Sequence, residues 1–75
     1  MEKNLLCRMA ETLQSNKVTI QNYDFDDAMD ILSKNNYSET DLQLFRSNAF
    51  QVYMELMRIE TIQNMHNSIY PNIKN

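Results

Sequence analysis

The chain has 75 residues, of which 43% are hydrophobic and 23% charged, and its formal net charge is −3. This composition argues against wholesale disorder, and no apolar run approaches the roughly 18 residues of a membrane span or has the form of a signal peptide. We therefore expect one small acidic cytoplasmic domain over residues 1–75, short enough that a homo-oligomer would help to bury its core.

The first half of the sequence predicts two short helices. Residues 2–15 form the first, and residues 16–22, rich in β-branched side chains, form an extended connector. The second helix covers residues 24–34, with Asp24 as its N-cap and Lys34 at its C-terminal end. Its expected buried side chains are Phe25, Ala28, Met29, Ile31 and Leu32.

The longest helical pattern runs over residues 38–69. Its apolar side chains recur every three or four residues and form one stripe, made of Leu42, Phe45, Ala49, Val52, Leu56, Ile59 and Ile62. Ser38, with Asp41 three residues later, indicates a capping box at its start, and Pro71 cannot continue the helix. We predict an all-α bundle of three to four helices with this long helix at its centre, and we place any break in it near Thr61.

The predicted long helix carries more apolar side chains than one neighbouring helix can cover. Phe50, Tyr53, Met54 and Met57 lie beside the main stripe. Two interpretations stay open: these residues complete the core of a small bundle, or they form a surface that binds a partner. We take these four residues as the candidate partner-binding site.

The sequence offers no catalytic, metal or cofactor site. Its single cysteine, Cys7, and single histidine, His66, cannot form an internal disulfide or the usual Cys/His zinc site, and both are expected to be structural. The absence of glycine excludes glycine-rich phosphate loops, and the scattered basic residues predict no direct sequence-specific binding of nucleic acid. The four aspartates of residues 24–30 lack the glycine and glutamate of a calcium loop and are interpreted as a helix cap and a solvated face.

Three motifs follow one another after Phe25. A short helix ends in a KN-x-Y turn at residues 34–37, and a later segment, residues 68–70, reads Ser-Ile-Tyr. Between them the helix has the pattern S-x-x-x-L-x-x-F-x-S-x-A-x-x-x-x-x-E-L, formed by Ser38, Leu42, Phe45, Ser47, Ala49, Glu55 and Leu56. With a small gap after Tyr37, this order resembles the Hha/YmoA family of haemolysin-expression-modulating proteins.

The resemblance implies a four-helix, non-enzymatic regulator that binds the dimerisation region of the nucleoid-structuring protein H-NS. In that family an Ala-Asp-His-Arg motif on the long helix contributes an aspartate to the contact. The corresponding residues here are Ala49, Phe50, Gln51 and Val52, so no H-NS-binding aspartate carries over. If the chain is a relative, its partner or its mode of contact differs.

We predict a cytoplasmic interaction module without enzymatic activity, an Hha-like modulator of transcription that acts through a DNA-bound H-NS-type partner. The alternative is a small subunit or chaperone of a secretion system or another helical assembly. Residues 27–56 resemble the hairpin of type III secretion needle subunits and their helical co-chaperones, but the needle family's Asn and Lys positions are not reproduced after Arg58.

Overall fold

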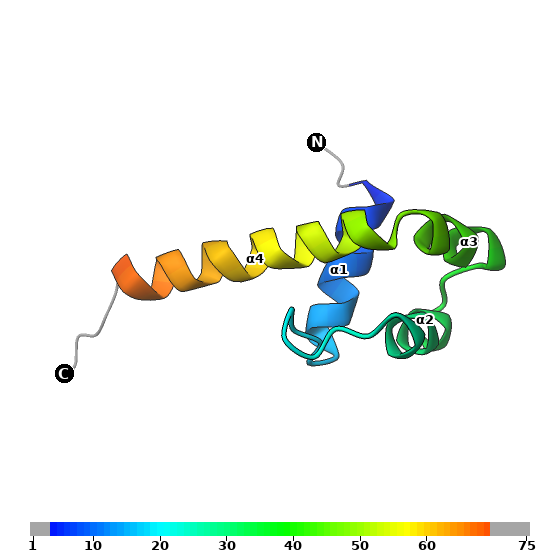
Figure 1. The fold of residues 1–75 in the computed structure, drawn as a ribbon, viewed down its shortest axis with the longest axis horizontal. Helices are drawn as coiled ribbons and strands as arrows, with labels where there is room; N and C mark the ends of the chain where they lie inside the picture. Colours follow the sequence, from blue (N-terminus) through cyan, green and yellow to red (C-terminus); the bar gives the residue numbers. More distant parts are fainter. Residues whose placement is uncertain (1–3, 70–75) are drawn as a thin grey trace.

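The structure is a computed structural model that describes residues 4–69. The described residues form four helices and no strand. The helices are α1 (Leu5–Ser15), α2 (Phe25–Lys34), α3 (Glu39–Ser47) and α4 (Ala49–Ile69). In Figure 1, α4 is the long element, α1 crosses it, and α2 and α3 lie toward its N-terminal end. The predicted all-α fold is confirmed.

Short polar side chains begin the first three helices. The Asn4 carboxamide oxygen accepts a hydrogen bond from the backbone N–H of Cys7 at 2.8 Å and caps α1. Asp24 caps α2 by accepting from the N–H of Asp27 at 3.0 Å, as the sequence predicts. Each cap gives a partner to a backbone N–H that has none inside the helix. The predicted start of the first helix, residues 2–3, lies outside the described residues.

The connector between α1 and α2 is folded into turns and is not extended as predicted. The Asn22 side chain donates to the carbonyl of Lys17 at 3.2 Å and accepts from the N–H of Thr19 at 2.8 Å. Lys17 has a φ of 68°, and the N–H of Val18 returns to the carbonyl of Leu13 at 3.0 Å. These turns bury Val18. Its β-branched side chain therefore packs in the core, and the backbone around it is not the extended strand-like segment that the sequence predicts.

The core lies between α1 and the N-terminal half of α4, with α2 and α3 closing one end. Its residues are apolar side chains from every helix and from the connector: Met9, Ala10, Leu13, Val18, Ala28, Leu32, Phe45, Val52 and Leu56. Burial of such side chains is the main favourable contribution to folding. Of the predicted stripe, Phe45, Val52 and Leu56 are buried, and Leu42, Ala49 and Ile59 pack against the core, as expected.

The helix predicted over residues 38–69 is divided at Asn48. The predicted capping box of Ser38 and Asp41 is present and starts α3. Asn48 ends α3, because its side-chain Nδ2 and its backbone N–H both donate to the carbonyl of Leu44, at 2.9 and 3.0 Å. Its own carbonyl then accepts from the N–H of Val52 at 3.1 Å, in the first turn of α4. No break occurs near Thr61, where the sequence analysis placed any break, since α4 is continuous through that residue.

The same asparagine arrangement ends the first three helices. The Nδ2 groups of Asn16 and Asn35 donate to carbonyls four residues earlier at 2.8 and 2.7 Å, like that of Asn48. Helices commonly end with a glycine, which this sequence lacks. Asparagine side chains instead give partners to carbonyls that the helix end leaves free.

Candidate interaction surface on α4

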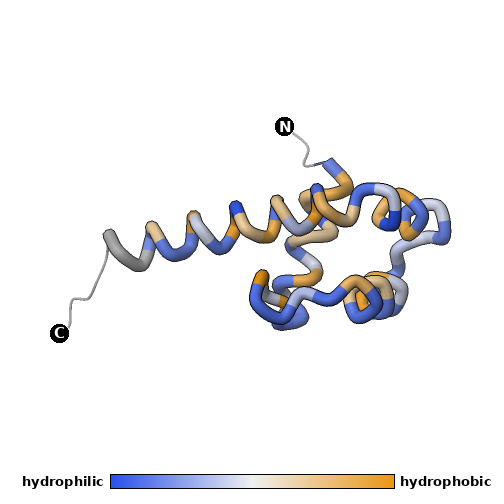
Figure 2. The backbone as a smooth tube through the Cα atoms, in the orientation of Figure 1, coloured by the Kyte–Doolittle hydropathy of each residue, from blue (hydrophilic) through white to orange (hydrophobic). Residues whose placement is uncertain are grey.

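α4 has apolar side chains on two sides. Val52 and Leu56 face the core and are fully buried, whereas Phe50 is 69% exposed and Met54 is 44% exposed. Figure 2 shows hydrophobic residues recurring along α4, including the stretch that runs past α1. An ordinary surface helix is apolar on one side only. The second apolar side of α4, which carries Phe50 and Met54, is left largely uncovered by the described residues.

The four predicted partner-binding residues lie on this second side. Phe50, Tyr53, Met54 and Met57 are spaced by three, one and three residues, which places them on one side of a helix. Phe50 and Met54 are exposed, Tyr53 and Met57 are half-buried, and none belongs to the buried core. We call these four residues the outer face of α4.

Aromatic rings connect the outer face to the body of the protein. The ring of Phe50 lies 6.5 Å from that of Tyr53, which in turn lies 5.2 Å from the ring of Tyr23 in the connector. The Tyr23 hydroxyl donates to the carbonyl of Ala49 at 3.1 Å, and burial raises the pKa of this phenol above its ordinary value of 10.0. Tyr23 therefore stays protonated and holds Tyr53 in place, leaving Phe50 at the exposed end of the row.

Polar contacts fix the rest of α4 against α1 and the connector. A carboxylate oxygen of Glu60 accepts from the N–H of Ile20 at 3.0 Å, and the Gln14 side chain donates to that of Gln63 at 2.8 Å. These bonds orient α4 so that the outer face points away from α1. Beyond Gln63, α4 runs past α1 (Figure 1).

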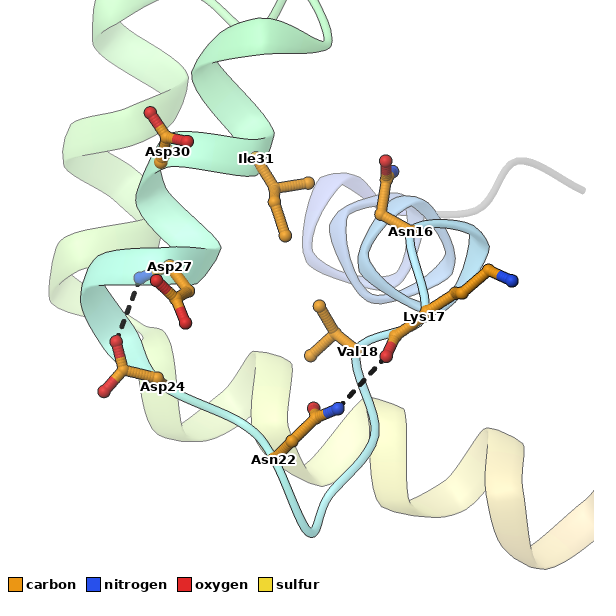
Figure 3. Close-up of a pocket in the computed structure, with 8 residues that line it drawn as sticks. All are labelled: Asn16, Lys17, Val18, Asn22, Asp24, Asp27, Asp30 and Ile31. Carbon is orange, nitrogen blue, oxygen red and sulfur yellow. Dashed lines mark hydrogen bonds between the residues drawn. The ribbon is translucent and has the colours of Figure 1, made fainter.

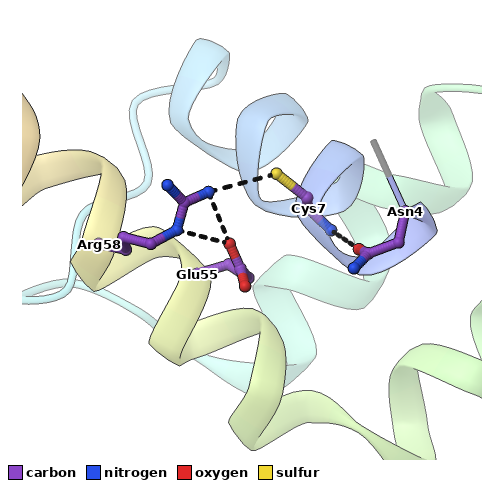
Figure 4. Close-up of polar contacts among 4 residues, drawn as sticks. All are labelled: Asn4, Cys7, Glu55 and Arg58. Carbon is purple, nitrogen blue, oxygen red and sulfur yellow. Dashed lines mark hydrogen bonds and ion pairs between the residues drawn. The ribbon is translucent and has the colours of Figure 1, made fainter. Parts of the chain in front are cut away.

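Arg58 links α4 to the single cysteine of the chain (Figure 4). Its Nη2 donates to the carboxylate of Glu55 at 2.9 Å and to the sulfur of Cys7 at 3.6 Å. The hydrogen bond to Glu55 is the main reason that the pKa of Arg58 is raised. Cys7 is buried in α1, as expected for a structural residue.

The sequence missed two exposed apolar residues near the end of α4. Ile62, which the periodicity assigns to the core, is 52% exposed, and Met65 is 58% exposed. The bond between Gln14 and Gln63 lies near the end of the contact between α1 and α4, with Ile62 just before it and Met65 beyond it. Ile62 also follows Leu56 by two steps of three residues, which turn it about 120° around the helix from that buried side chain. His66 lies on the same stretch and is exposed.

Asp24, Asp27 and Asp30 line a pocket of about 310 Å³ beside the connector (Figure 3). Its walls include Asp24, Asp27 and Asp30 on one side and Lys17 and Val18 on the other. Asp24 caps α2, and Asp30 forms an exposed ion pair with Lys34 at 3.0 Å, consistent with a cap and a solvated face. Among residues 4–69, no group of three acidic, histidine or cysteine side chains is arranged to hold a metal ion.

Comparisons of the chain with models of protein families, with curated proteins and with solved structures find no significant match. Within the described part of the chain, no helix is both long enough and apolar enough to cross a membrane.

Proposed function

We propose that the chain is a non-enzymatic protein-interaction module that binds its partner through the outer face of α4. The observation that carries this proposal is Phe50, an aromatic side chain that is 69% exposed yet held at the end of an ordered row of rings. Exposed apolar patches on small proteins commonly mark binding sites, and aromatic residues commonly dominate the binding energy there.

The partner that we propose first is a DNA-bound protein of the H-NS type, so that the chain acts as a modulator of transcription. The Hha-like motifs support this choice, as does the net charge of −3, which favours contact with DNA through a partner and not directly. Phe50 stands where the family has its contact aspartate, so we expect the contact to be apolar in this chain.

A capture experiment tests this proposal. The purified chain is immobilised and exposed to H-NS and its paralogues, alongside the variants Phe50→Ala and Leu44→Ala. Leu44 is the matched control, because it is also an exposed large apolar residue (41%) but lies on α3, outside the outer face. We expect capture by the wild type and by Leu44→Ala, and loss of capture with Phe50→Ala. If the wild type captures no H-NS-type protein, the proposal of an H-NS-type partner is refuted.

A second candidate function is a subunit or chaperone of a helical assembly. It is favoured by the exposed Ile62 and Met65 near the C-terminal end of α4. Light scattering over a dilution series tests it, with an Ile62→Ser, Met65→Ser variant as the comparison. An oligomer that this variant dissociates would support the assembly role, whereas a stable monomer that captures no small helical client would count against it.

A further inference from the structure

A single residue, Asn48, makes the whole bend between α3 and α4. Its φ and ψ are −127° and 28°, each about 60–70° away from the values of an α-helix. α1 and α2 also end at asparagines, Asn16 and Asn35. At those two ends a residue of positive φ follows, Lys17 in one case and Asn36 in the other, and turns the chain. After Asn48 the chain enters α4 at once, so the backbone departs from a continuous helix at one residue.

The bend leaves backbone groups at the start of α4 without backbone partners. Within the described residues 4–69, the N–H groups of residues 49–51 donate to no backbone carbonyl. In a helix that continued through Asn48, each of them would donate to the carbonyl four residues earlier, at residues 45–47. Straightening the chain at Asn48 would therefore add three backbone hydrogen bonds.

The apolar side chains on the two sides of the bend would also fit a straight helix. Phe45 on α3 and Val52 and Leu56 on α4 are fully buried. At 3.6 residues per turn, a helix that is continuous through Asn48 would place these three side chains within about 40° of one another. A straight helix would keep one apolar side, but it would carry α4 away from α1, because the bend brings α4 back across α1 (Figure 1).

The side of α4 that packs on α1 needs cover in either shape. Val52 and Leu56 belong to the same buried core as Met9 of α1, and the Gln14 side chain of α1 donates to that of Gln63 at 2.8 Å. A straightened chain would expose all of these side chains. A second chain that is straightened in the same way offers the missing surfaces, because its α1 is also uncovered.

We propose that two copies of the chain form a dimer by exchanging α4, with Asn48 as the hinge. In each copy α3 and α4 join into one helix, and each α4 packs on the α1 of the other copy. The core contacts of Val52 and Leu56 are then formed between chains, so little packing is lost. Short hinges such as this single residue favour the exchange of an element between copies.

This inference goes beyond the proposed function and does not rest on it. The exchange uses the side of α4 that carries Val52 and Leu56, whereas the outer face lies on another side of the helix. The exchanged dimer therefore carries the outer face twice. Two linked binding faces give a higher overall affinity for a partner that repeats its own site.

Substitutions at the hinge test whether straightening controls the exchange. Asn48→Ala and Asn48→Gly both remove the side-chain bond to the carbonyl of Leu44, but alanine favours a helix at this position and glycine disfavours it. Because each dimer has two hinges, we expect the dimer association constant of Asn48→Ala to exceed that of Asn48→Gly by at least about tenfold. Full chains refolded from urea at several concentrations and analysed by size-exclusion chromatography with light scattering give these constants. Equal constants would overturn the inference.

Asn35 provides the matched control for the hinge. Its Nδ2 donates to the carbonyl of Ile31 at 2.7 Å in the same arrangement, but the residue of positive φ that follows it prevents a simple straightening. We expect Asn35→Ala and Asn35→Gly to have equal dimer association constants, with far-UV circular dichroism showing that each variant is folded. The same ratio of alanine to glycine variants at both positions would overturn the role of Asn48.

A disulfide distinguishes an exchanged dimer from any other dimer. Gln14→Cys with Gln63→Cys, in a chain that also carries Cys7→Ala, places two thiols where side chains are hydrogen-bonded between α1 and α4. We expect oxidation of the separated dimer to link the two chains, so that it runs as a dimer on a denaturing gel without reductant, whereas the separated monomer stays a single chain. Disulfides formed within each chain of the dimer would overturn the inference. So would the absence of any dimer after refolding at millimolar concentration, with Asn48→Ala included.

Discussion

Replacing Phe50 by alanine should remove binding while leaving the fold intact. Full burial of a phenylalanine side chain contributes about 1.5–3 kcal/mol. Phe50 is 69% exposed, so about a third of that contribution, roughly 0.5–1 kcal/mol, is lost with the ring. The higher helix propensity of alanine returns part of this loss. We therefore expect the free energy of unfolding to fall by less than about 1 kcal/mol.

Phe45 gives the contrasting case, because the same substitution removes a ring that is fully buried. Phe45→Ala should cost about 3–5 kcal/mol, the loss of burial together with the cavity that remains. A chain of 75 residues has a total stability of about 4–11 kcal/mol, so Phe45→Ala should remove from about a quarter to all of it.

Urea unfolding followed by far-UV circular dichroism measures both effects. With a slope of about 1 kcal/mol per molar urea, Phe50→Ala should lower the midpoint by less than about 1 M, and Phe45→Ala by about 3 M or more. A loss of about 2 kcal/mol or more for Phe50→Ala would refute the reasoning, because it would mean that Phe50 is part of the core in solution.

The remaining predictions concern the contacts that position α4. Asn48→Ala removes the side-chain hydrogen bond at the end of α3 and should lower the free energy of unfolding by about 1 kcal/mol in urea. The folded state raises the pKa of Tyr23, so stability should fall as the pH rises above 10.0, and Tyr23→Phe should remove that dependence in a thermal-unfolding series. Glu60→Ala removes the acceptor of the Ile20 N–H, so amide hydrogen exchange at Ile20 should accelerate, whereas Glu60→Gln, which keeps an acceptor oxygen, should slow it again.

The parts of the fold that local sequence determines were predictable. The caps at Ser38 and Asp24 follow from side chains that reach backbone N–H groups three residues away, and the spacing of Phe45, Val52 and Leu56 identifies a buried side. These features depend on residues close in the sequence, so reading the sequence alone was enough.

The break at Asn48 was not predictable from apolar spacing. Phe45 and Val52 lie on either side of it and are both buried. The three- and four-residue spacing of apolar side chains therefore continues across the break and does not reveal it. Asparagine occurs inside helices as well as at their ends, and only the hydrogen bond of Asn48 to the carbonyl of Leu44 distinguishes the two cases.

The sequence identified the four residues of the outer face of α4 but did not show whether they are buried or exposed. The spacing of Phe50, Tyr53, Met54 and Met57 places them on one side of a helix, whether that side is covered or exposed. What decides between core and surface is the path of α1, which lies against the opposite side of α4 and contacts it as far as Gln63. That path depends on packing between distant segments.

The central claim is that the outer face of α4 is where a partner binds. The most direct test is an NMR titration of methionine methyl groups with the protein that the chain captures. Met54 and Met57 lie on the outer face, whereas Met9 is buried in the core and Met29 packs against it. We predict that the signals of Met54 and Met57 shift on binding while those of Met9 and Met29 stay in place. Shifts confined to Met9 and Met29, with Met54 and Met57 unchanged, would contradict the claim.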